Sequence, residues 1–174
     1  MEYESLNQHY LYPAALYASD EECIVTTVLG SCVAVCLFDK TTNIGGINHF
    51  MLPYWNGQGL SSPKYGNIAI PKLIDKLASL GVKKSHLIAK VFGGGEVIEA
   101  SSQIFNIGVR NIALAEELLH ELKIPIVARS VGGKNGRKIT FNTKTGEVKQ
   151  KLITTKRLDL SAFHPDNAFI KKLS

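Results

Sequence analysis

The sequence has few of the cysteines, long apolar runs and metal-ligand motifs that are typical of secreted, membrane-spanning or metal-stabilised proteins. Its 174 residues include three cysteines, Cys23, Cys32 and Cys36, an odd number at irregular spacing. Such a count argues against a disulfide framework and fits a reducing cytoplasm. No run approaches the ~20 apolar residues that a membrane helix needs, and the polar, acidic N-terminus does not resemble a secretory signal. We therefore expect a cytoplasmic protein without membrane insertion.

Metal and phosphate motifs are also missing. Cys32 and Cys36 stand four residues apart without a second pair of ligands, so a zinc site is not expected. The glycine-rich segments 93–96 and 132–138 lack both the Gly-Lys-Ser/Thr ending of a phosphate loop and the three-glycine spacing of a dinucleotide site. We predict no metal and no cofactor, and interpret these glycines as turns or as backbone that comes close to a substrate.

Charge gives only a weak indication of the partner. The formal net charge is +5, with a basic cluster at 134–138 and further cations at Lys151, Lys156 and Arg157. This balance mildly favours acidic partners. No basic module interleaved with aromatic residues is present, so no nucleic acid partner is expected, although charge alone leaves that alternative open.

The hydrophobic pattern predicts one α+β domain spanning residues 1–174. Strands are expected at 24–29, 33–38, 86–92 and 124–131, with a hairpin of 137–142 and 147–153. Amphipathic helices are expected at 67–80 and 106–122, and an apolar run at 44–52. Residues 1–20 are expected to cover the edge of the core loosely, and residues 156–174 form a less certain C-terminal extension. Strands and helices do not alternate strictly, which favours α+β over a doubly wound sheet.

Cys32 is the strongest candidate nucleophile. Most cysteines in apolar runs are buried structural thiols, and Cys23 and Cys36 fit that description. Cys32 differs because it follows Gly30-Ser31, a tight turn that can expose its sulfur. If Cys32 also opened a helix, free N–H groups there would favour the thiolate and could bind an oxyanion. Gly30 and Ser31 would supply that backbone support.

His49 is the candidate base for Cys32. It lies within the apolar run 46–53, where an ionisable side chain needs a reason, although a satisfied core histidine is an equally good interpretation. If the two segments pair as neighbouring strands, the imidazole can face the thiol. Surface placement explains the other four histidines, His9, His86, His120 and His164. The group that would orient His49 stays open, because Thr26 and Thr27 are both hydroxyl candidates on the preceding strand.

Two segments together resemble a known family. Residues 30–39, beginning Gly30-Ser31-Cys32, and residues 45–53, containing His49-Phe50-Met51-Leu52-Pro53, are similar to the CheD chemoreceptor glutamine deamidases. Segments 64–66, 92–95, 106–111 and 131–133 fit as well, so the resemblance spans roughly residues 10–155.

The resemblance implies an activity and a site. Members of the family convert chemoreceptor glutamines to glutamate and can act as receptor methylesterases. Their Cys-His-Thr triad corresponds to Cys32, His49 and Thr26, since Thr26 stands six residues before the cysteine. The implied fold has mixed β-sheets packed together and flanked by helices, similar to the catalytic domains of deamidating toxins. The implied partners are receptor helices and the phosphatase CheC. A module that only binds receptor or phosphatase is the competing hypothesis.

Overall fold

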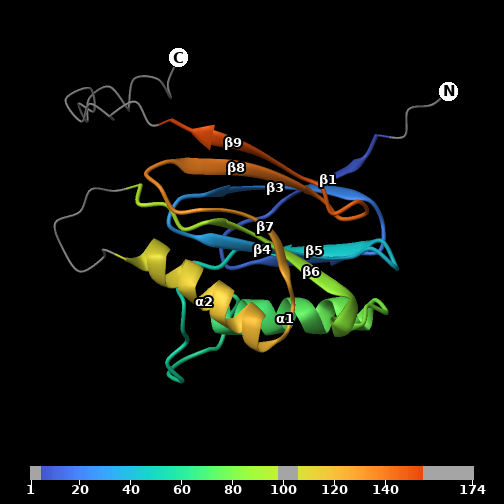
Figure 1. Cartoon of the computed structure of the whole chain (residues 1–174), viewed down its shortest axis with the longest axis horizontal. Helices are drawn as coiled ribbons and strands as arrows, with labels where there is room; N and C mark the ends of the chain where they lie inside the picture. Colours follow the sequence, from blue (N-terminus) through green and yellow to red (C-terminus); the bar gives the residue numbers. More distant parts are fainter. Residues whose placement is uncertain (1–4, 98–105, 155–174) are drawn as a thin grey trace, which may run out of the picture.

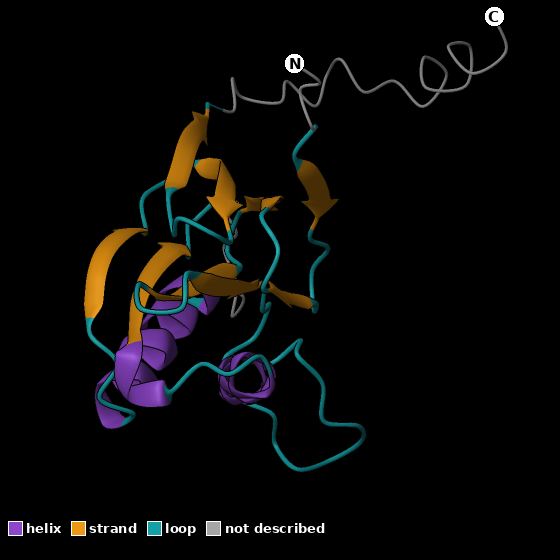
Figure 2. Ribbon diagram, turned by 90° about the vertical axis from the view of Figure 1, so that its right-hand side faces the viewer, coloured by secondary structure: helices purple, strands orange, loops and turns teal. Residues whose placement is uncertain are grey.

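Three layers make up the structure, a computed structural model that describes residues 5–97 and 106–154. Two β-sheets pack face to face, and two helices cover the outer face of the second sheet (Figure 1). The same layering is seen from the side in Figure 2. This arrangement confirms the α+β class with mixed sheets flanked by helices. The proposed single domain and its extension beyond residue 156 stay predictions, since residues 155–174 lie outside the described ranges.

The first sheet has four strands in the order β1-β3-β8-β9. Its only parallel pair is β1 with β3, and the β8–β9 hairpin follows the pattern expected from the sequence. The strands are β1 (Asn7–Tyr10), β3 (Cys23–Leu29), β8 (Gly136–Asn142) and β9 (Val148–Ile153). Both helices of the described residues lie on the far side of the second sheet, away from the outer face of this sheet (Figure 1).

The second sheet has five strands in the order β2-β5-β4-β6-β7. Its central strand β4 is buried along its whole length, as the unbroken apolar run 33–38 predicts. The strands are β2 (Leu16–Ser19), β4 (Val33–Asp39), β5 (Ile44–Asn48), β6 (Leu87–Gly93) and β7 (Ile126–Val131), and a short 3₁₀ turn, η1 (Lys84–His86), precedes β6.

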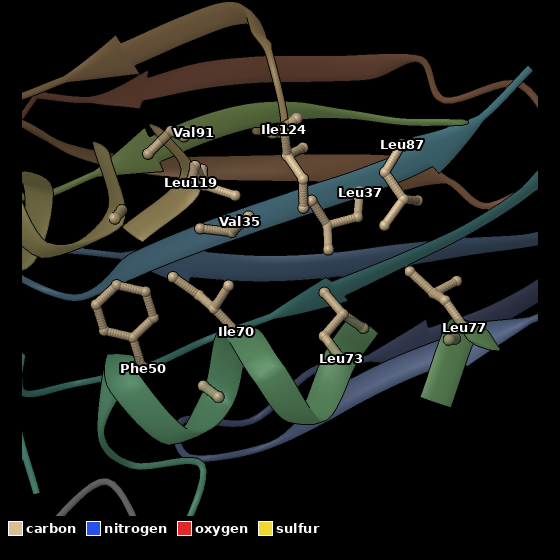
Figure 3. Close-up of a cluster of buried hydrophobic side chains, with 14 of the residues drawn as sticks. Val35, Leu37, Phe50, Ile70, Leu73, Leu77, Leu87, Val91, Leu119 and Ile124 are labelled. Carbon is tan, nitrogen blue, oxygen red and sulfur yellow. The ribbon is translucent and has the colours of Figure 1, made fainter. Parts of the chain in front are cut away.

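Helices α1 (Gly66–Ser79) and α2 (Ile107–Glu121) cover this second sheet. Ile70, Leu73 and Leu77 of α1 are buried against Val35 and Leu37 of β4 (Figure 3). Gly81, with φ of +94°, follows the last turn of α1 as the expected helix stop. No helix in residues 5–97 and 106–154 is long and apolar enough to cross a bilayer.

A second core lies between the two sheets and is the one that matters for the site. It is formed by alternating residues of β3 and β8 from one side and of β4 and β5 from the other. Its members are Leu11, Cys23, Val25, Leu29, Ala34, Cys36, Ile47, Phe92, Ile139 and Phe141, with Cys32 packed at its margin. Side chains that point into this layer are shielded by a sheet on each side.

Two expectations from the sequence were wrong in detail. Residues 5–20, the described part of the N-terminal segment, lie at the edges as expected but are not loose, because they supply β1 and β2, each a paired edge strand of its sheet. The buried face of α2 is also rotated relative to the expected apolar stripe. Val109 is 50% exposed, whereas Gly108 and Asn111 are buried. This rotation allows Gly108 of α2 to approach the backbone of Gly94 closely.

Candidate active site

Cys32 lies immediately before β4, at the end of the layer between the two sheets. Its side chain is half-buried, whereas Cys23 and Cys36 are 2% and 1% exposed. The expected difference between Cys32 and the two structural cysteines is thus confirmed. Cys32 precedes a strand and not a helix, so no helix N-terminus stabilises its thiolate.

All three carbonyls of the segment Gly30-Ser31-Cys32 are held by donors. The backbone N–H of Gly95 donates to Gly30 O (2.8 Å) and that of Gly94 to Cys32 O (2.9 Å). The side-chain amide of Asn111 donates to Ser31 O (3.0 Å). With its carbonyls turned away and fixed, the segment has a defined conformation around the thiol.

The N–H groups of Ser31 and Cys32 differ from these carbonyls in their hydrogen bonding. Neither the N–H of Ser31 nor that of Cys32 donates a hydrogen bond to another described residue, although the Cys32 N–H lies near its own thiol. Two adjacent N–H groups beside a thiol, without an acceptor in another described residue, can bind the oxyanion of a tetrahedral intermediate. A helix N-terminus, which would have provided such N–H groups if Cys32 had opened a helix, is therefore not needed for this arrangement.

Gly93, the last residue of β6, and Gly94 after it allow the Cys32 segment and α2 to pack closely against this part of the chain. Gly93 has φ of +107°, and a Cβ atom there would overlap the carbonyl oxygen of Cys32. Gly94 has φ of +67°, and a side chain there would meet Ile112 of α2. A Cβ on Gly108 of α2 would in turn lie 2.5 Å from Gly94 O. The glycine-rich segment 93–96 therefore supports the Cys32 backbone directly.

His49 and Cys32 lie on one face of an antiparallel pair. The bridge between Val33 and Phe50 continues the β4–β5 register, which places Ala34 opposite His49. Cys32 precedes β4 and packs against the same core between the sheets as Ala34, so Cys32 and His49 lie on the same side of this sheet. The condition stated for a contact between the two side chains, that their segments pair as neighbouring strands, is met. Nε2 of His49 forms no hydrogen bond with a described residue, the thiol included.

The other ring nitrogen of His49 is held by the facing sheet. The Thr27 hydroxyl of β3 lies 2.7 Å from Nδ1 of His49 and donates to the carbonyl of Leu11 at 2.8 Å. A hydroxyl has one proton, so Thr27 accepts the second hydrogen bond and Nδ1 must carry the hydrogen. Nε2 is then the unprotonated nitrogen, which is the form that a general base requires.

Thr26 does not occupy the position that the sequence comparison gave it. Inward-facing residues of β3 alternate as Cys23, Val25, Thr27 and Leu29, and Thr26 faces the other side of the sheet. Its backbone carbonyl accepts from Leu11 N–H at 2.8 Å. The expected contact between Thr26 and His49 was therefore wrong, and Thr27 makes that contact.

Burial keeps both reacting groups neutral. Desolvation lowers the pKa of His49 to about 4, and its ring is 2% exposed. Desolvation also raises the pKa of the Cys32 thiol, although its own backbone N–H partly opposes that shift. The resting pair is a thiol and an imidazole, not a thiolate and an imidazolium.

The remaining histidines have ordinary surroundings where the structure describes them. His9 stacks on Tyr17, with ring centroids 4.4 Å apart. Nδ1 of His86 lies 3.7 Å from a carboxylate oxygen of Asp39, and His120 is exposed at the end of α2. His164 lies outside the described residues. His49 is the histidine that this geometry brings to Cys32.

Comparison with known proteins shows the family of the chain. The family model for CheD chemotactic sensory transduction matches residues 51–152. A probable chemoreceptor glutamine deamidase CheD from Trichlorobacter lovleyi is 52% identical over 143 residues, covering 82% of this chain and 89% of the relative. The chain belongs to the CheD family. A CheD of Sulfurimonas denitrificans, also named a probable chemoreceptor glutamine deamidase, is 43% identical over 159 residues, covering 88% of this chain and 97% of the relative.

Two asparagines beside the candidate site were not among the site residues predicted from the sequence. Asn111 of α2 and Asn48 of β5 are both fully buried. Asn48 accepts a hydrogen bond from Val35 N–H (2.9 Å) and so ties β4 to β5 next to His49. A polar residue inside an apolar helical stripe or strand run, as both are, was the signal that could have identified them.

Proposed function

We propose that this CheD-family protein hydrolyses the side-chain amide of selected chemoreceptor glutamines to glutamate. The names of its relatives support the substrate class. The observation that carries the chemistry is the ring of His49, whose Nδ1 is held by Thr27 and whose Nε2 has no described partner, on the same side of the second sheet as Cys32. In this proposal Cys32, His49 and Thr27 form the catalytic triad, with Thr27 replacing the expected Thr26.

The first half of the reaction forms a thioester. Sγ of Cys32 attacks the glutamine amide carbon while its proton moves to Nε2 of His49. The carbonyl oxygen becomes an oxyanion, and the N–H groups of Ser31 and Cys32 donate to it. When the intermediate collapses, the C–N bond breaks and His49 returns the proton to the leaving ammonia. In this scheme Ser31 supplies backbone support through its N–H group, and Gly30 does so through its carbonyl, which accepts from Gly95 N–H and fixes the segment.

The second half restores the thiol. A water molecule attacks the thioester carbon and gives a proton to Nε2 of His49. The C–S bond then breaks, the proton returns to sulfur, and glutamate leaves. Thr27 holds Nδ1–H throughout, so that the developing imidazolium keeps its orientation. No metal or cofactor takes part in this scheme. A receptor methyl ester offers the same acyl carbon, so the proposal extends to methylesterase activity.

The proposed partners follow from the substrate. Each deamidation replaces a neutral amide by an anion on packed receptor helices, which alters charge repulsion and shifts their signalling equilibrium. The protein would act on cytoplasmic receptor segments, and CheC would compete with them for the site. An excess of positive charge suits acidic helices.

A mass-shift assay tests the proposal. A cytoplasmic receptor fragment is incubated with the wild type, Cys32→Ala, and Cys36→Ala as a control at a buried cysteine of β4, the strand that follows Cys32. We expect conversion of glutamine to glutamate with the wild type and with Cys36→Ala, and none with Cys32→Ala. Equal deamidation by wild type and Cys32→Ala would sink the assignment. A receptor or CheC effect that is fully retained in Cys32→Ala would favour the binding module.

A further inference from the structure

The mechanism above leaves Asn111 unused. This side chain is 0% exposed and lies on the sheet-facing side of α2. Its Nδ2 donates to two backbone carbonyls, Ser31 O and Met51 O, each at 3.0 Å. An amide nitrogen has two protons, so both are used. One side chain on the helix layer therefore holds two separate segments of the sheet.

Those two segments carry the nucleophile and the base. Ser31 directly precedes Cys32, and Met51 follows His49 by two residues. The backbone bridge between Val33 and Phe50 is the last ladder contact of the strand pair. Beyond it the chains separate, since Met51 N–H donates to Lys64 O and Cys32 O accepts from Gly94 N–H. The Asn111 amide joins the two segments past this point.

The side-chain amide of Asn111 would destabilise the fold if it served only to fill space in the core. Its Oδ1 is buried without a hydrogen-bond partner among the described residues. A buried acceptor without a partner destabilises a fold, and an apolar side chain would fill the same space without that loss. The two donated hydrogen bonds, and not burial, distinguish asparagine from leucine at this position.

We propose that Asn111 is a positioning residue, which holds the Cys32 and His49 segments in register for proton transfer from Sγ to Nε2. This inference rests on the proposed function for its role in catalysis. Its structural part, control of the Cys32 segment, is independent of any substrate and can be measured on the thiol itself.

The test compares Asn111→Leu with Thr143→Val. Thr143 is also fully buried and also makes two hydrogen bonds to backbone, accepting from Cys23 N–H and donating to Glu21 O, at the opposite end of β3. Three quantities are measured: kcat and KM on the receptor fragment, the pH profile of Cys32 alkylation by iodoacetamide followed on the Cys32 peptide, and Tm.

For Asn111→Leu we expect kcat to fall by about tenfold to hundredfold with little change in KM, because small misplacements of reacting groups have effects of that size. We expect Cys32 alkylation to become severalfold faster as the segment loosens. Thr143→Val should lower Tm and leave both other quantities unchanged. If Asn111→Leu does not fold, Asn111→Ser takes its place, since its smaller side chain leaves room for water to reach both carbonyls.

The inference is overturned if an Asn111 variant keeps the wild-type kcat and alkylation profile while its Tm falls as in Thr143→Val. If the wild type itself does not deamidate the fragment, the proposed function fails. The alkylation profiles then still decide whether Asn111 controls the Cys32 segment.

Discussion

The hydroxyl of Thr27 joins His49 to the facing sheet. It lies 2.7 Å from Nδ1 of His49 while donating to Leu11 O, so the ring is fixed in one tautomer by a residue of β3. Since β3 and the His49 segment belong to different layers, the packing of the two sheets sets the orientation of the proposed base. Any change that slides one sheet over the other would misalign the site.

Thr27→Val should therefore reduce kcat far more than Thr26→Val does. Valine has the shape of threonine but cannot accept from Nδ1–H, so the ring loses its tautomer and orientation. We expect a loss of about tenfold to hundredfold for Thr27→Val, the size that loss of a positioned group produces. Thr27→Ser should retain most activity. The measurement is kcat on a receptor fragment, with Tm as a control for folding.

The adjacent residue gives the matched comparison. Thr26 sits on the same strand with its side chain on the opposite face, so Thr26→Val should stay near the wild-type kcat. A larger loss for Thr26→Val than for Thr27→Val would contradict the geometry and restore the correspondence that the family resemblance implies.

Thr26 and Thr27 show how much of the candidate site could be predicted from the sequence. The sequence left open whether the Cys32 and His49 segments pair, and the structure pairs them through β4 and β5. The choice between Thr26 and Thr27 rested on spacing from the cysteine. The alternation of side chains along β3 indicates Thr27 and not Thr26, since Cys23, Val25 and Leu29 share a face with Thr27.

Other parts of the site depend on contacts that a sequence does not display. Asn111 reaches Ser31 across 80 residues, and Gly94 approaches Gly108 backbone to backbone. Such contacts follow from the packing of α2 on the sheet. The edge strands β1 and β2 were missed because their short segments are exposed or half-buried and show no apolar alternation.

Stability should fall as the pH drops from about 6.5 to 4. The folded protein holds His49 with a pKa of about 4, while an unfolded histidine has one near 6.5. Between these values the unfolded chain binds a proton that the folded chain does not, so unfolding becomes easier, by up to about 3 kcal/mol. Chemical denaturation across this window measures the effect.

A substitution of His49 isolates that contribution. His49→Gln should remove most of the loss of stability between pH 6.5 and 4, while His120→Gln, at the exposed end of α2, should keep the wild-type slope. A wild-type unfolding free energy that stays constant across the window would show that His49 is not held neutral by burial.

The Cys32 thiol should react slowly at neutral pH in the free protein. Burial raises the pKa of the Cys32 thiol, and the neutral imidazole of His49 offers no positive charge to a thiolate. The rate of iodoacetamide alkylation at Cys32 should therefore keep rising above pH 8, and His49→Gln should change it little. A plateau reached below pH 7 would instead indicate a preformed thiolate–imidazolium pair.

Gly93→Ala should abolish activity by displacing the nucleophile. A Cβ at residue 93 would overlap the Cys32 carbonyl oxygen, and its φ of +107° disfavours any other residue. The segment must move, which separates Sγ from His49 and breaks the hydrogen bond from Gly94 N–H to Cys32 O.

Gly57→Ala is the matched control, since Gly57 also has a positive φ, +87°, but no atom within 4 Å of a built Cβ. We expect kcat to fall by at least about a hundredfold for Gly93→Ala, as for other misplaced reacting groups, and to stay near wild type for Gly57→Ala. Similar activity in both variants would mean that the Cys32 backbone does not need its contact with Gly93.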